Sequence, residues 1–469
     1  MVNGVLALSM VFLLTRTLTS EQYGGYALGI AVIGSGASIL FQWIAVTVSR
    51  FYSAHSSNPG GLIAEGKKLF FLVSIIPLIL TVAVVVFPQK INVNPIFAII
   101  TCIGILAAGV HNLCLQVANA SGQPLRYGIL TVSRNIISGI AAIILIQFNY
   151  GELGAICGAV IGTVLSVTFF SVRHRIYENK RNSELRSQLV NYGLPLTVTF
   201  FSTMMLDVSD RFIIAWFLGK PAVAGYAAAY DLTQQTIGAL LNVLFLVSYP
   251  RITAAWESSG VLGARLAMTS LSQAMLLAIP LLAAIFTGGA TLISNVILGP
   301  TIRDEAATLT PLIAFAITVG CFKNFYLDIA FQLVKKTNTI LKISITMAIV
   351  NLLLNVFLIP IFGVIGAAAA TAVAVSFGAL LSWWFGRRIH IYSICFWDGM
   401  RMLFVFTAVI LAMQFAPTSE YGNLQKAIIS IAIALISYSL AIFLIDLANI
   451  RQITKIKIKT FMKYKSNYK

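Results

Sequence analysis

Three charged residues, Asp207, Asp210 and Arg211, lie within an otherwise apolar stretch, MMLDVSDRFIIAWFLG. If residues 191–219 form one membrane helix, Asp207 lies twelve residues from its end, which is about 18 Å deep in a bilayer about 30 Å thick. Charges at that depth are costly, so they mark either an internal ion pair or a functional site. Their i, i+3, i+4 spacing predicts that all three side chains share one helix face.

Two interpretations of this face stay open. In the first, Arg211 neutralises Asp207, and the helix packs against its neighbours. In the second, the face lines a water-filled cavity, where the planar fork of Arg211 holds a phosphate and a carboxylate carries a coupling proton or cation. The two can coexist, because an ion pair can open when a substrate arrives.

Other charged residues lie in or beside apolar stretches. Lys323 and Asp328 are in the middle of one stretch and five residues apart, a spacing that on an α-helix favours exposure to a cavity over a mutual pair. Arg134 lies about one third of the way along another stretch. The candidate substrate-binding residues are Arg211, Arg134, Lys323, Arg16 and Arg50, of which Arg16 and Arg50 also suit interfacial anchors; the candidate ion-coupling residues are Asp207, Asp210 and Asp328.

The sequence argues against cofactor and enzyme chemistry. Its five cysteines form no C-x-x-C pair, and its four histidines are scattered without metal-ligand spacing. It has no G-x-x-x-x-G-K-[ST] motif for ATP. We therefore expect no catalytic residues, no metal and no cofactor.

These residues must be positioned by membrane helices. The 469 residues are 58% hydrophobic and only 10% charged, whereas a soluble protein carries about 25% charged residues. The sequence predicts an all-α polytopic membrane protein. A membrane span needs about 20 mostly apolar residues, and we expect fourteen spans, near 1–15, 23–49, 69–87, 95–118, 127–147, 153–172, 192–218, 223–247, 266–297 (with a kink at 288–290), 307–331, 340–360, 363–386, 401–416 and 426–447.

The basic residues orient these spans. With fourteen spans and both termini inside, 23 lysines and arginines fall in inner segments and five in outer ones. The formal net charge of +17 thus reflects membrane topology and gives no reason to expect a nucleic-acid partner. The basic tail, 448–469, is expected to contact anionic membrane lipids on the cytoplasmic side. Because the first span has only fifteen residues before Arg16, we expect that further residues precede Met1.

Two halves of the chain resemble each other. Gly25-Tyr26-Ala27 recurs as Gly225-Tyr226-Ala227, and the segment that starts at Gly151 (GELGA) recurs at Gly363 (GVIGA). Repeated halves around a central cavity are typical of secondary transporters. We predict an N-terminal lobe at 1–172, a cytoplasmic linker at 173–191, a C-terminal lobe at 192–386, two further helices at 387–447 and the tail.

Three segments carry a resemblance to a known family. LLTRTLTSEQYGGYAL (13–28), VTVSRFYS (46–53) and LDVSDRFIIAWFLG (206–219) resemble signature segments of bacterial polysaccharide transporters, the O-antigen and exopolysaccharide flippases of the multidrug/oligosaccharidyl-lipid/polysaccharide exporter superfamily. The resemblance implies an inner-membrane protein that moves an undecaprenyl-pyrophosphate-linked repeat unit from the cytoplasmic to the periplasmic leaflet. It also implies a polysaccharide polymerase and chain-length machinery as candidate partners.

Two other functions are compatible with the composition. A drug antiporter of the same superfamily would favour an acidic cavity, yet acidic and basic residues within the spans are balanced at four each. A membrane-embedded polysaccharide polymerase would need a sizeable polar loop, whereas the expected outer loops have about ten residues or fewer. The motifs favour the flippase.

Overall fold

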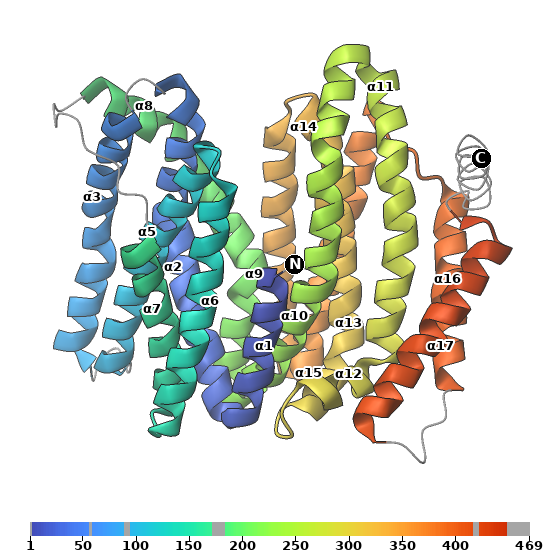
Figure 1. Ribbon diagram of the computed structural model, residues 1–469, viewed down its shortest axis with the longest axis horizontal. Helices are drawn as coiled ribbons and strands as arrows, with labels where there is room; N and C mark the ends of the chain where they lie inside the picture. The colour runs from blue at the N-terminus through green and yellow to red at the C-terminus, as the bar shows by residue number, and fades with distance from the viewer. Residues whose placement is uncertain (1, 56–58, 89–93, 171–182, 416–421, 448–469) are drawn as a thin grey trace, which may run out of the picture. The chain divides into compact units, whose positions relative to one another are not determined.

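The computed structural model describes residues 2–55, 59–88, 94–170, 183–415 and 422–447 (Figure 1). Within these ranges every regular element is a helix, and eleven helices are long and apolar enough to cross a membrane. A further apolar helix, Gly4–Thr17, is shorter. The expected all-α polytopic fold is therefore confirmed, while the count of fourteen crossings stays a prediction. The basic tail and much of the expected linker lie outside the described residues.

The chain divides into two compact units, each of which is described by itself. Unit 1 comprises residues 1–227 and 352–367, and unit 2 comprises residues 228–351 and 368–469. The lobe boundaries expected from the sequence stay a prediction.

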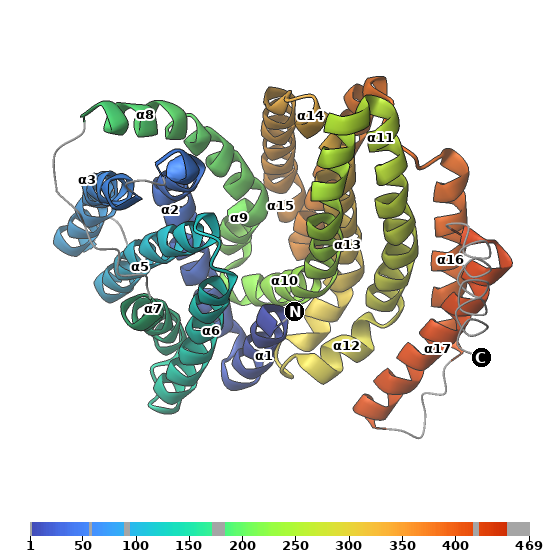
Figure 2. The ribbon, with the colours of Figure 1, turned by 45° about the horizontal axis from the view of Figure 1, so that its top comes forward.

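Unit 1 is a bundle of helices, and several of its long helices begin at a capping residue or a proline. Thr19 and Gln22 form a reciprocal capping box at the start of the second helix, and prolines occupy the first turn of two others, where a missing N–H costs nothing. Helix α6 packs along α7, and α2 along α5 (Figure 2). The elements are α1 (Val2–Thr17), α2 (Ser20–Tyr52), α3 (Pro59–Val86), α5 (Pro95–Ala120), α6 (Pro124–Gln147), α7 (Gly151–Phe170), α8 (Ser183–Gly193), α9 (Leu196–Leu218) and the first part of α10 (Lys220–Thr233).

Unit 2 contains the remaining helices. Helix α11 turns back on itself at Gly260, whose φ of 60° is open to glycine at little cost, so its two arms run antiparallel (Figure 1). The break expected at 288–290 is confirmed, because α11 ends at Gly288 and a new helix begins at Ala290. The elements are α11 (Ala239–Gly288), α12 (Ala290–Ile297), α13 (Arg303–Phe322), α14 (Ile329–Leu333), most of α15 (Thr337–Gly386), α16 (Phe396–Gln414) and α17 (Asn423–Leu444).

Two short π-helices interrupt the α-helical path. Element η2 (Gln234–Gly238) joins α10 to α11, and η3 (Lys323–Leu327) joins α13 to α14. A π-turn inserts one extra residue, so it rotates every following side chain relative to the preceding helix. The apolar pattern of the sequence predicts neither π-helix.

The sequence repeat coincides with a shared backbone feature. Gly151 and Gly363, which open the two matching segments, both have positive φ, 48° and 61°. Gly151 is the first residue of α7, and Gly363 lies at a kink within α15, where its non-helical backbone separates two helical segments. The two matching segments therefore resemble each other in the backbone conformation of their first glycine as well as in sequence.

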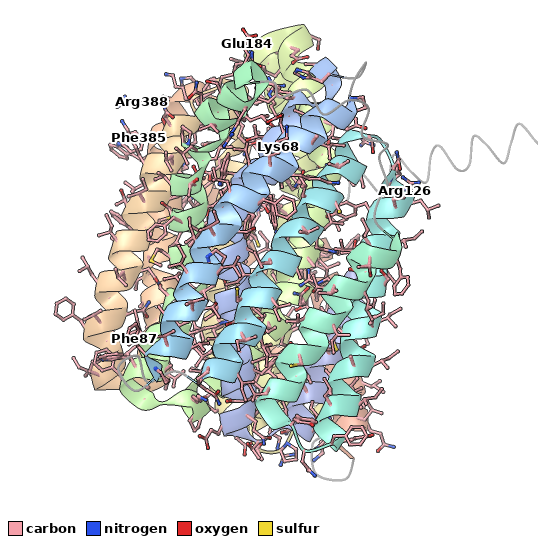
Figure 3. All side chains as sticks on the ribbon, turned by 90° about the vertical axis from the view of Figure 1, so that its left-hand side faces the viewer. Lys68, Phe87, Arg126, Glu184, Phe385 and Arg388 are labelled. Carbon is pink, nitrogen blue, oxygen red and sulfur yellow. The ribbon has the colours of Figure 1, made fainter. Side chains whose placement is uncertain are left out.

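The outer faces of unit 1 are those of a membrane protein. Large apolar side chains along α3 are exposed, among them Phe71 at 72%, Ile79 at 61% and Leu80 at 62%. Such a face is stable only against lipid or another apolar surface. Lys68, Arg126 and Glu184 lie toward one end of unit 1 and Phe87 toward the other (Figure 3).

Candidate functional site

The three charged residues of α9 do not share one environment. Asp210 is fully buried and accepts a hydrogen bond from the hydroxyl of Tyr226 on α10. Arg211 is also buried, at 8% exposure. Asp207 is exposed, and it has neither a hydrogen bond nor an ion pair within the described ranges. Asp207 and Arg211 thus form no direct ion pair within the described ranges, although their two charges interact electrostatically, and both interpretations of this helix face stay open.

The repeated Gly-Tyr-Ala motif contributes directly to this arrangement. Its second copy places Tyr226, which is 1% exposed, against Asp210. A carboxylate buried without a partner would be strongly destabilising, and the hydroxyl of Tyr226 supplies one hydrogen bond. The motif was noticed in the sequence as a repeat, but its role as a partner of Asp210 was missed.

The first copy of the motif and the glycine before it, Gly24, lie at a tight contact among α2, α7 and α10. A Cβ at Gly24 would overlap the carbonyl oxygen of Lys220, and one at Gly25 would overlap the carboxylate of Glu152. The same two residues form an ion pair, with 3.1 Å between Lys220 Nζ and Glu152 Oε1. The glycines thus let three helix starts meet, which explains the YGGYAL segment by packing.

Replacement of Gly24 by alanine tests this contact. We expect Gly24→Ala to lower the free energy of unfolding by about 1–3 kcal/mol, because the new methyl group overlaps rigid backbone. Gly128→Ala is the matched control, since it lies in helix α6 with no atom near the position of its Cβ. It should be neutral or stabilising by about 0.4–1 kcal/mol. Equal thermal unfolding of the two purified variants would contradict the packing role.

Arg134 lies at a cavity within unit 1. The cavity has a volume of about 180 Å³ and is lined by α2, α5, α6 and α7. Asn112 and Thr163 are the other polar residues on its wall. All of the helices that line this cavity belong to unit 1, and the substrate-binding role expected for Arg134 stays a prediction.

In unit 2, Lys323 and Asp328 bind each other. Lys323 Nζ lies 2.8 Å from Asp328 Oδ2, and the two residues are 2% and 3% exposed. The expectation that they would face a cavity and not each other is wrong. The π-helix is the reason, because its hydrogen bond from Asp328 N to Lys323 O (2.9 Å) places residues five apart on the same face.

The pair is embedded in further hydrogen bonds. Asp328 Oδ1 accepts from Ser382 on α15 at 2.7 Å, and Lys323 also donates to the side chain of Asn324 at 3.2 Å. With each member satisfied, neither is available to a substrate in this conformation. Lys323 and Asp328 are therefore best understood as a structural pair that joins η3 to α15.

A polar network beside this pair was missed by sequence reasoning. The hydroxyl of Tyr326 accepts from the backbone N–H groups of Ser393 and Ile394, at 2.9 and 3.1 Å, and Ser393 Oγ donates to Ser272 Oγ at 2.9 Å. Tyr392 donates to the carbonyl of Leu327 at 2.7 Å, and burial and the nearby Asp328 raise the pKa of Tyr392. The network fixes the segment between α15 and α16.

The two remaining candidates lie at helix ends. Arg16 is in the last turn of α1 and stacks over the ring of Phe12, 4.2 Å from its centroid. Arg50 is exposed in the last turn of α2. Both positions suit interfacial anchors. In the described part of the chain, no group of three or more metal-ligating side chains gathers.

A comparison of the sequence with known families is decisive. The family described as "Polysaccharide biosynthesis protein" matches residues 1–256, which is more than half of the chain. The chain belongs to this family. The match covers all of unit 1 that precedes α11, including the α9 segment and the Gly24–Gly25 contact.

Three proteins from archaea are similar to this chain in sequence. The probable flippase AglR of Haloferax volcanii is 27% identical over 177 residues, which is 37% of this chain and 36% of AglR. An uncharacterized membrane protein of Methanocaldococcus jannaschii is 24% identical over 44% of this chain and 40% of its own. The probable low-salt glycan biosynthesis flippase Agl15 of Haloferax volcanii is 22% identical over 78% and 76%. The similarity to the first two relatives thus covers only 36% and 40% of their length.

Solved structures confirm the fold of this family member. A lipid II flippase, MurJ, in an inward closed conformation superposes with a TM-score of 0.75 at 14% identity, over 94% of this chain and 97% of that one. An inward-facing multidrug resistance transporter of the MATE family gives a TM-score of 0.66 at 13% identity, over 82% and 94%. At these identities the likeness concerns the fold alone. The relatives named for an activity are flippases, whereas none is named as a polymerase.

Proposed function

We propose that this protein is a flippase that moves a lipid-linked oligosaccharide from the cytoplasmic to the outer leaflet of the membrane. The observation that carries the proposal is the family match over residues 1–256, together with relatives that are named flippases of glycan biosynthesis. The fold shared with a lipid II flippase supports it. The substrate that we propose is an undecaprenyl-pyrophosphate-linked repeat unit, as the signature segments suggest.

The proposed mechanism is alternating access. The glycan and pyrophosphate would occupy a polar pathway while the lipid trails into the bilayer, and rocking of one helical unit against the other would expose the pathway to each side in turn. Without an ATP motif in the sequence, the energy would come from an ion gradient or from the supply of substrate.

Helix α9 carries the groups that we propose for the pathway. Asp207 is an exposed carboxylate that makes no hydrogen bond or ion pair within the described ranges, so it suits a coupling proton or cation, which needs an accessible site. Asp210 and Arg211 are buried next to it. The planar fork of Arg211 would meet the pyrophosphate only after a rearrangement of α9 and α10 that exposes it.

The function is tested in two steps. A bacterial strain that lacks its own repeat-unit flippase should regain surface polysaccharide when it expresses this chain, with the protein level checked by blot. Purified protein in liposomes should then make an undecaprenyl-pyrophosphate oligosaccharide accessible to an external glycan-degrading enzyme. Efflux of a cationic dye without either activity would favour the drug antiporter and would overturn the proposal.

A further inference from the structure

We propose that unit 1 contains a binding site for a small inorganic anion, formed around Arg134 in the cavity between α2, α5, α6 and α7. The proposal concerns a halide or a phosphate-sized oxyanion. It is independent of the proposed flippase function, because it rests on the contents of this one cavity.

The cavity contains an unbalanced positive charge. Arg134 is the eleventh residue of α6, about 15 Å along a helix about 36 Å long, so it lies far from either helix end. Within the described residues it makes neither a hydrogen bond nor an ion pair. A guanidinium presents five N–H donors, and leaving it without a partner at this depth is costly.

The surrounding helices supply no carboxylate to neutralise Arg134. Their only acidic residues are Glu21 and Glu152, both in the first turn of a helix. Glu152 is already paired with Lys220. Water could solvate the guanidinium, but only a bound anion would neutralise its charge within the cavity.

The polar groups on the wall complement an anion. The side-chain amide of Asn112 has no hydrogen bond among the described residues, so its N–H groups are available beside the guanidinium. The hydroxyl of Thr163 already donates to the carbonyl of Ala159, at 2.8 Å. The free donors are thus those of Arg134 and Asn112, and no side chain on this wall carries a negative charge.

The size of the cavity limits the ligand. At about 30 Å³ per water molecule, 180 Å³ corresponds to about six waters. Sites for drug-sized ligands occupy about 300–1,000 Å³, so an oligosaccharide does not fit here, whereas a halide or phosphate does. Gly34 preserves this space, because a Cβ at that position would meet no other atom within 4 Å.

Thermal unfolding of the purified full chain tests the site. A ligand that binds only the folded state raises the melting temperature in a saturable way. We expect bromide, chloride or phosphate to raise it by a few degrees relative to gluconate at constant ionic strength. A rise with the halides alone identifies a halide site, and a rise with phosphate alone identifies an oxyanion site. The same melting temperature in all four salts would overturn the proposal.

Three variants make the test specific. Arg134→Gln should abolish the anion-dependent rise, and Gly34→Val should abolish it by filling the cavity while the charge is kept. Arg126→Gln is the matched control, because Arg126 is an exposed arginine on the same helix, and its rise should equal that of the wild type. If Arg134→Gln does not fold, Gly34→Val decides. An undiminished rise in Gly34→Val would place the anion elsewhere and overturn the assignment.

Discussion

Replacement of Lys323 by methionine is expected to lower the free energy of unfolding by about 3–5 kcal/mol. The variant would leave Asp328 buried at 3% exposure without its cation, and removing one partner of a buried ion pair carries a cost of this size. The measurement is unfolding of the detergent-purified protein by heat, followed by tryptophan fluorescence and by loss of the monodisperse peak in size-exclusion chromatography.

Two further variants separate the pair from a general effect of charge. Lys323→Met combined with Asp328→Leu removes both charges and should recover most of the lost stability, because the uncompensated charge is what destabilises. Lys342→Met changes an exposed lysine near the start of α15 and should shift stability by no more than about 0.5 kcal/mol. If the double variant is no more stable than Lys323→Met, the pair does not act as a unit.

Replacement of Asp207 by asparagine is expected to reduce transport at least tenfold while the folded protein persists. Asp207 is exposed and makes no hydrogen bond or ion pair in the described structure, so its replacement removes a charge without breaking a direct contact. Asparagine keeps the shape but cannot bind a proton or neutralise a cation. Restored surface polysaccharide and the liposome assay are the two measurements.

The controls for Asp207 use residues of the same type. Asp207→Glu keeps the carboxylate and should retain part of the activity. Asp304→Asn alters a carboxylate that is 86% exposed at the start of α13 and should leave transport unchanged. Wild-type transport in Asp207→Asn would remove this residue from the mechanism. Asp210→Asn differs in kind, since it disturbs the buried contact with Tyr226 and is expected to reduce the amount of folded protein.

The sequence by itself determined the helices. Apolar runs of about twenty residues predict membrane spans because the bilayer sets their length, and the glycine pair at 288–289 predicted the break between α11 and α12. The signature segments predicted the family, which the match over residues 1–256 confirmed. These properties depend on residues that are adjacent along the chain.

The environments of the charged residues were decided by the tertiary structure. On an ideal α-helix Lys323 and Asp328 point in different directions, and only the π-turn between them brings them to one face. Helical spacing grouped Asp207 with Arg211, yet packing with α10 buries Arg211 and Asp210 and leaves Asp207 outside. The cavity at Arg134 requires side chains from four helices. A local pattern fixes which residues lie on a helix, but the burial and partners of each side chain depend on neighbours distant in the chain.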